Sequence, residues 1–135
     1  MMKTVLYPLQ VSIFQRLKSY TPLTSKVSGI YDSNQTKAFP YITLGEDTSV
    51  PWSTKSNPGE EVTHTLHVWS QYNGSKEVKE LMSLIVEAIT DKPLPIEGGF
   101  FVGFGEVDMM EVMMDPDGKT RHGIIRLRFK ILQGE

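Results

Sequence analysis

Residues 61–91 read EVTHTLHVWSQYNGSKEVKELMSLIVEAITD, and this stretch decides the fold. Residues 62–70 alternate between two faces and are rich in β-favouring types, which predicts a strand buried on one side. Asn73 and Gly74 tolerate the positive φ angles of a tight turn, and Ser75 can cap a following helix. Residues 75–90 predict an amphipathic helix on the sheet, because apolar residues recur at helical steps: Val78, Leu81, Met82, Ile85 and Ile89.

Four further segments complete the predicted order. Residues 5–20 have the apolar spacing of a helix, while residues 39–44 and the glycine-containing residues 100–107 are typical of strands. Residues 123–132 alternate most clearly, with one apolar face made of Ile125, Leu127, Phe129 and Ile131. The order α-β-β-α-β-β predicts an α+β fold, an antiparallel sheet of about four strands packed against two helices. Residues 27–31 are a candidate for an extra short edge strand.

Residues 46–60 are the least regular part of the sequence. They are rich in glycine, proline, serine, threonine, asparagine and aspartate, and their apolar island is Val50, Pro51 and Trp52. A connection of this length without secondary structure is usually functional or disordered. We therefore expect a long mobile loop between the first two main strands.

The length and composition place limits on the class of protein. A chain of 135 residues fits a single domain spanning residues 1–135, and the absence of cysteine excludes disulfides and thiolate chemistry. The formal net charge of −2 disfavours a protein devoted to non-specific nucleic-acid binding. No apolar run is long enough to cross a bilayer, and the first residues do not form a secretory signal, so no membrane partner is expected.

The sequence does not predict an enzyme, a cofactor or a metal site. His64 and His67 are three residues apart on a predicted strand, so they point to opposite faces and cannot share an ion. His122 is expected to be a hairpin residue. Asp115 and Asp117 are expected to belong to a solvated turn, because the residues that follow lack the ligands of a calcium loop. No nucleophile elbow, phosphate loop or complete dinucleotide motif is present.

Two groups of residues are candidates for contact with other molecules. Met109, Met110, Met113 and Met114 cannot all be buried on one side of a strand, so they form either a partner interface or ordinary edge packing. Val50 and Trp52 are a candidate anchor, unless the loop folds back onto the body. A basic stripe, defined by Arg126, Arg128 and Lys130, is interpreted either as a solvated face balanced by acidic neighbours or as a surface near DNA.

Several blocks, taken in order, carry a family resemblance. They are IYD at 30–32, FPYITLGE at 39–46, EEV at 60–62, LHVWS at 66–70, GSKEV at 74–78 and DPDGKTRHG at 115–123. In these blocks the chain resembles the tail-completion proteins of long-tailed phages and prophages, over most of its length. The family was formerly a domain of unknown function, and its fold is similar to that of the phage lambda tail-terminator protein.

The resemblance implies a structural virion assembly protein that joins the tail tube to the head connector at the neck. It implies a ring, expected to be hexameric, and a location in the virion after assembly in the bacterial cytoplasm. It implies no catalytic residues. Two alternatives remain open, a tail terminator that caps the tail tube and a small nucleic-acid-binding or regulatory module. If DNA passes through the ring, the basic stripe or acidic positions would line the lumen.

Overall fold

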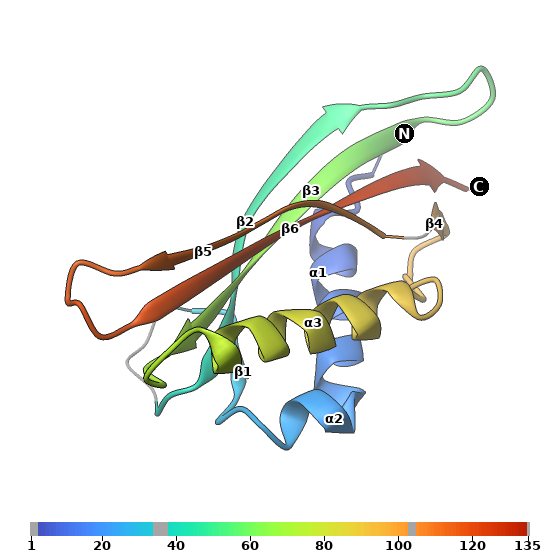
Figure 1. The fold of residues 1–135 in the computed structure, drawn as a ribbon. Coiled ribbons are helices and arrows are strands. Elements are labelled where there is room, and N and C mark those ends of the chain that lie inside the picture. Colours follow the sequence, from blue (N-terminus) through green and yellow to red (C-terminus); the bar gives the residue numbers. More distant parts are fainter. Residues whose placement is uncertain (1–2, 34–37, 103–104, 135) are drawn as a thin grey trace.

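The fold has two layers, a twisted six-stranded sheet and helices that cover one of its faces (Figure 1). The computed structural model describes residues 3–33, 38–102 and 105–134. Its elements in chain order are α1 (Leu6–Ser19), α2 (Thr21–Thr24), β1 (Ile30–Tyr31), β2 (Tyr41–Pro51), β3 (Gly59–Ser70), α3 (Lys76–Thr90), β4 (Phe100–Val102), β5 (Glu106–Met114) and β6 (Arg121–Gln133). The α+β class is confirmed.

The sheet is larger than predicted and is mixed. Its strand order is β1-β2-β3-β6-β4, and β5 also pairs with β6. β1 runs parallel to β2, whereas the other pairs are antiparallel. The prediction of about four antiparallel strands and two helices is therefore wrong in detail. β1 lies within the candidate edge strand at residues 27–31, and β4 lies within the strand predicted over residues 100–107. The prediction missed α2, whose four residues are too few for a periodic pattern to reveal.

The loop predicted over residues 46–60 is mostly strand. β2 continues to Pro51 and β3 begins at Gly59, so the connection is confined to residues 52–58. The two strands project as a hairpin arm beyond the helices (Figure 1). Composition was misleading here because β2 is an edge strand over this length. Its main chain is paired with β3, while many of its side chains face water and so can be polar.

The strand predicted over residues 100–107 corresponds to β4 and the start of β5, and β5 continues beyond the prediction to Met114. β4 pairs with one end of β6 and β5 with the other, while residues 103 and 104 lie outside the described part of the chain. Gly105 fits here because a Cβ at this position would lie 2.6 Å from the Phe129 ring. The backbone of Gly105 therefore lies too close to Phe129 to leave room for a side chain.

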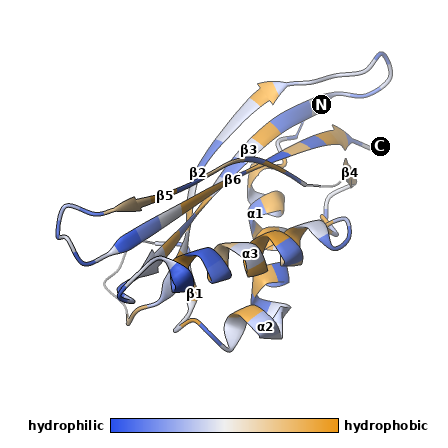
Figure 2. Cartoon of the chain, in the orientation of Figure 1, coloured by the Kyte–Doolittle hydropathy of each residue, from blue (hydrophilic) through white to orange (hydrophobic). Residues whose placement is uncertain are grey.

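The core lies between the sheet and helices α1 and α3. The predicted apolar face of α3 is fully or almost fully buried, as is the predicted inner face of β6. Figure 2 shows that both α3 and β6 carry hydrophobic and hydrophilic residues along their length, as elements with one buried face do. Each large apolar side chain buried in this way contributes about 1.5–3 kcal/mol through removal from water. The face of the sheet away from the helices, here called the outer face, carries Tyr41, Thr63, His67, His122 and Arg126.

The junction between β3 and α3 differs from the prediction at one residue. Gly74 has a φ of +123°, as expected for the turn. Ser75, however, makes no side-chain capping hydrogen bond. Glu77 in the first turn of α3 instead accepts a hydrogen bond of 2.6 Å from the Ser70 hydroxyl, which ties the helix to the end of β3.

Candidate functional site

The four methionines of β5 lie on both faces of the sheet. Met109 and Met113 pair in register with Arg126 and His122 and share the outer face with them. Met110 and Met114 lie on the helix side. Met110 is 53% exposed, Met114 45% and Met113 38%, and Met109 is half-buried. β5 therefore presents three flexible apolar side chains to solvent, an arrangement suited to adaptable contacts.

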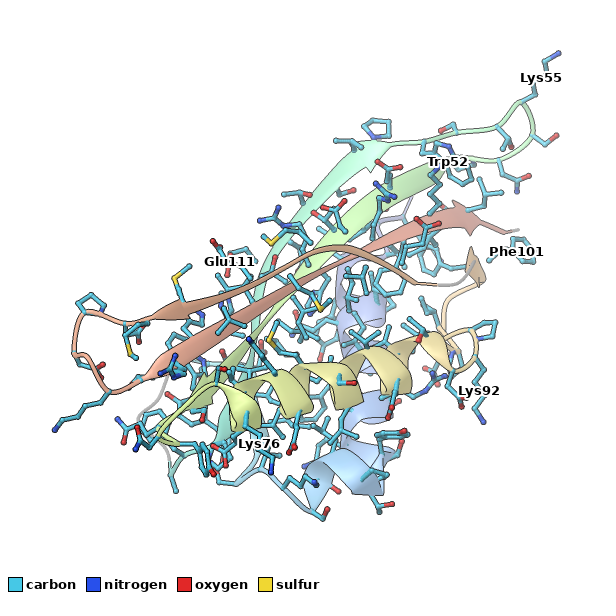
Figure 3. The ribbon with its side chains drawn as sticks, viewed as in Figure 1. Trp52, Lys55, Lys76, Lys92, Phe101 and Glu111 are labelled. Atoms are coloured by element: carbon cyan, nitrogen blue, oxygen red, sulfur yellow. The ribbon has the colours of Figure 1, made fainter. Side chains whose placement is uncertain are left out.

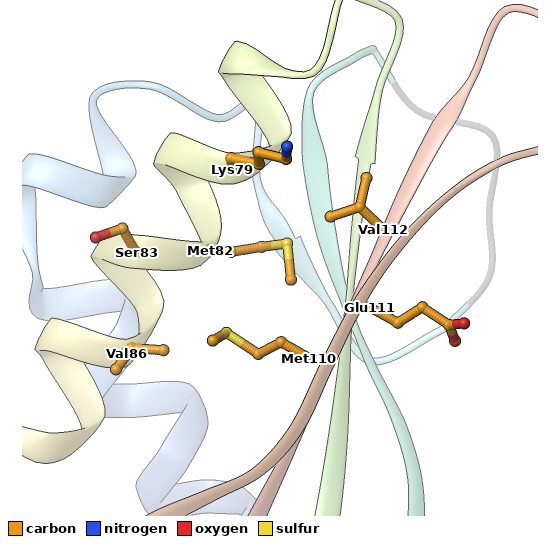
Figure 4. Close-up of a pocket in the computed structure, with 7 residues that line it drawn as sticks. All are labelled: Lys79, Met82, Ser83, Val86, Met110, Glu111 and Val112. Atoms are coloured by element: carbon orange, nitrogen blue, oxygen red, sulfur yellow. The ribbon is translucent and has the colours of Figure 1, made fainter.

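A groove lies between β5 and α3. Its volume is about 360 Å³, and it is lined mainly by Met82, Ser83 and Val86 of α3 and by Met110 and Val112 of β5. In Figure 4, Met110 points toward Met82 and Val86, while Glu111 points away from the groove. The groove is thus an apolar depression directly beside the outermost strand of this end of the sheet.

The hairpin arm carries the second exposed apolar group. The main-chain N–H of Trp52 donates a hydrogen bond to the Gly59 carbonyl at 2.8 Å. Trp52 therefore lies at the base of the connection, and Lys55 lies at its tip (Figure 3). The Lys130 ammonium lies 5.5 Å from the centre of the Trp52 ring. Trp52 therefore rests partly against the body, yet it stays 37% exposed, and Val50 is 52% exposed.

Two strand edges have unpaired stretches in the described part of the chain. β1 pairs with β2 only at Ile42 and Thr43, so the rest of β2 is paired only with β3. β5 is paired only with β6. The sheet thus has free backbone donors and acceptors on both sides, next to Val50 at one edge and the methionines at the other.

The basic stripe is balanced by carboxylates. Arg128 contacts Glu106 at 2.9 Å and Asp108 at 3.3 Å. The hydrogen bond and the charge of Arg128 lower the pKa of Glu106, and the same pair raises the pKa of Arg128. Lys130 lies 4.0 Å from Glu61. These contacts place carboxylates beside two of the three residues of the basic stripe, Arg128 and Lys130.

An imidazole pair on the outer face is the feature that the sequence analysis missed. His67 Nδ1 lies 2.6 Å from His122 Nε2, and His67 Nε2 lies 2.7 Å from a carboxylate oxygen of Glu46. The His122 ring stacks on Trp69 with centroids 3.9 Å apart. Burial and the nearby His67 lower the pKa of His122. Only the register of β3 against β6, which pairs Trp69 with His122, brings these rings together.

The remaining histidine, His64, and the turn residue Asp117 make contacts apart from this pair. His64 is buried on the helix side, where its Nδ1 contacts Asp47, while His67 lies on the outer face, so the two rings point in opposite directions. Within the same described ranges, no group of three or more His, Asp or Glu side chains could hold a metal. The Asp117 carboxylate accepts N–H hydrogen bonds from Lys119 and Thr120, both 2.8 Å, as a turn residue does.

No helix within the described ranges is long and apolar enough to cross a membrane.

The comparisons with known proteins decide the family. The family model described as tail completion protein gp17 matches residues 11–132. The chain belongs to the tail completion protein gp17 family. Its likeness extends to the tail completion protein gp17 of Bacillus phage SPP1, which is 38% identical over 124 residues, or 91% of each chain. The family resemblance drawn from the sequence blocks is therefore confirmed.

Solved structures agree with this membership. The structure of bacteriophage SPP1 gp17 matches with a TM-score of 0.67 at 35% identity, over 94% of this chain and 91% of that one. A chain in the virion of a native gene transfer agent particle matches with a TM-score of 0.83 over 97% of this chain and 99% of that one. Its identity is 16%, so this second likeness concerns the fold alone. The protein is a phage tail completion homologue, and such proteins are structural.

Proposed function

We propose that this tail completion homologue joins the phage tail to the head connector at the virion neck, as a hexameric ring formed in the bacterial cytoplasm. In this role it is not an enzyme and needs no cofactor. The observation that carries the proposal is the pair of exposed apolar surfaces at opposite edges of one sheet. A structural protein uses such surfaces for subunit contacts, whereas a monomeric protein rarely leaves them uncovered.

The two surfaces are different, which favours a ring over a two-fold dimer. One surface is the hairpin arm with Val50 and Trp52; the other is β5 with its methionines and the adjoining groove. A head-to-tail contact joins two unlike surfaces, and repeated rotation closes such contacts into a ring. The free edges of β2 and β5 can add main-chain hydrogen bonds across this contact.

The outer face of the sheet is the candidate lumen face. Arg128 of its basic stripe is paired with Glu106 and Asp108, and Lys130 lies near Glu61, so the surface carries both charges rather than a net basic patch. Double-stranded DNA could pass such a face without binding tightly, because few cations remain free to release its counterions. A dedicated nucleic-acid-binding module has weaker support for the same reason.

The test is a joining assay with purified tails and DNA-filled heads from particles that lack this protein. We would replace residues 53–58 by Asn-Gly, which allows a two-residue hairpin turn and leaves the strands of the arm intact. In a second variant, Met110→Glu, a charge enters the apolar groove. Both variants are expected to stay folded and to lose joining, counted as complete particles by electron microscopy.

The control is Tyr7→Ser, because Tyr7 is 71% exposed and belongs to α1, which contributes no residue to the groove or to the Val50 and Trp52 surface. This control variant should join tails to heads at the wild-type level. Native mass measurement of the protein alone and with tails gives the subunit number. Wild-type joining by both the shortened hairpin and Met110→Glu would remove the basis of the proposed interface.

The same purified tails and heads distinguish the proposed joining role from the tail-terminator alternative. A protein that caps the tube acts on tails before heads are present, so tails that are incubated first should bind the ring and stop elongating. A neck-joining protein changes the yield of joined particles without changing tail length. A salt titration with duplex DNA, comparing wild type with Arg126→Ala and Arg128→Ala, tests the nucleic-acid alternative.

A further inference from the structure

The chain of hydrogen bonds around His67 fixes where its protons lie. A carboxylate only accepts hydrogen bonds, so the 2.7 Å contact with Glu46 requires a proton on His67 Nε2. In a neutral ring the other nitrogen, Nδ1, is then an acceptor. The 2.6 Å contact with His122 Nε2 therefore needs its proton on His122. The two rings share one N–H···N hydrogen bond with a defined direction.

This arrangement accepts one further proton and rejects a second. A proton can be added at His122 Nδ1, which faces the Asp115 carboxylate at 3.7 Å, and the hydrogen bond between the rings survives. The next proton would have to bind His67 Nδ1. That nitrogen already receives the His122 N–H at 2.6 Å, so two N–H groups would point at one another between two cations. The rings would have to move apart.

Charged groups from each neighbouring element influence the pair. Glu46 comes from β2, Glu111 from β5 and Asp115 from the end of β5, and each favours a protonated His122. Arg126 on β6 lies near Glu46 and favours its ionised form. Against these, the rings are largely buried, with exposed side-chain fractions of 15% for His67 and 13% for His122. Both rings also pack against Trp69, which offers no charge and no acceptor.

The pair connects Glu46 of β2 to Asp115 at the end of β5. Beside it is a second connection, in which Trp69 stacks on His122 and donates a hydrogen bond to Thr43 of β2. Glu46 lies where the register of β2 against β3 shifts, between Leu44 and Asp47. Asp115 begins the turn that joins β5 to β6. Moving the rings apart would therefore release the irregular part of β2 on one side and the β5–β6 turn on the other.

We propose that His67 and His122 form a proton-operated latch between β2 and the β5–β6 turn. The latch is closed while the pair carries at most one added proton, and it opens when both rings become imidazolium in mildly acidic solution. This inference concerns the isolated chain and does not depend on the ring or on the neck.

The test is a titration of the full chain by NMR, with separately assigned ring signals for His64, His67 and His122. One ring of the pair should titrate below the ordinary histidine value, because strongly interacting sites lose their protons in two separated steps. In His67→Gln the remaining ring of the pair should titrate in one step, at a pH above the lower step of the wild-type pair by about one unit or more. Glutamine keeps hydrogen-bonding capacity at this position but carries no charge. A single step in this variant at the pH of the lower wild-type step would overturn the proposal.

Amide hydrogen exchange reports the opening itself. Between pH 7.5 and 5.5, protection factors at residues 45–47 and 115–122 should fall by about tenfold or more, while those of α3 stay constant. In His122→Gln this selective fall should disappear. If that variant does not fold, Asp115→Asn serves instead, because loss of this carboxylate should shift the opening to lower pH. A wild-type chain with constant protection, or a fall that persists in the variants, would show that no latch exists.

Discussion

The buried carboxylate of Glu60 accepts the main-chain N–H of Val5 at 3.0 Å. Its second oxygen accepts hydrogen bonds from the hydroxyls of Ser49 at 2.7 Å and Thr4 at 3.1 Å. The carboxylate therefore joins the start of α1 to both strands of the hairpin arm, and it places negative charge near the positive end of the helix dipole.

Replacing Glu60 should weaken this junction measurably. Glu60→Ala leaves a buried N–H without its acceptor, so the free energy of unfolding should fall by about 1–3 kcal/mol. Urea denaturation followed by circular dichroism measures this difference. Glu61→Ala is the matched control, because Glu61 is half-buried and only approaches Lys130 at 4.0 Å. A loss as large in the control would contradict the assigned role of Glu60.

Gly123 should not tolerate a side chain, because α3 packs directly on it. A Cβ there would lie 2.7 Å from the Met82 sulfur and 2.9 Å from a Val78 methyl. Gly123→Ala should cost about 1–3 kcal/mol through overpacking. Met82→Ala makes room, so the double variant should be more stable than the sum of the two single losses predicts, by about 0.5–3 kcal/mol. Thermal unfolding of the four proteins tests this, and simple additivity would disprove the contact.

The carboxyl of Glu106 should titrate differently without its arginine. The hydrogen bond and charge of Arg128 hold the pKa of Glu106 below its ordinary value. In Arg128→Ala the pKa of Glu106 should rise toward its ordinary value. An NMR titration of the Glu106 side-chain carboxyl carbon measures this change. Asp117 is an internal control, because its lowered pKa comes from hydrogen bonds with Thr120 and Lys119, and it should not move.

The β5–β6 turn should lose stability in acid. Hydrogen bonds from Thr120 and Lys119 lower the folded-state pKa of Asp117 below 3.8, so the unfolded chain binds a proton more readily. The stabilisation by the ionised Asp117 carboxylate is present above pH 3.8, the ordinary pKa of this group, and is lost as the pH falls through the folded-state pKa. Asp117→Asn should therefore have a lower Tm than wild type at neutral pH, and the two should converge in acid. A difference that stays constant with pH would contradict this explanation.

Local sequence patterns determined the elements whose signal repeats within a few residues. The apolar face of α3, the alternation along β6 and the turn containing Asp117 could all be predicted, because each depends on spacing or turn chemistry within one segment. The opposite orientations of His64 and His67 followed from the same period of two. The ordered blocks also sufficed to recognise the family.

The tertiary structure decided everything that depends on pairing between distant residues. β2 is a strand up to Pro51 because β3 supplies main-chain hydrogen-bond partners, although the amino-acid composition after residue 45 is typical of a loop. The His67–His122 pair exists because the register of β3 against β6 places residues 55 positions apart at hydrogen-bonding distance. No local pattern encodes such a register, since it is set by hydrogen bonds and packing across the whole sheet.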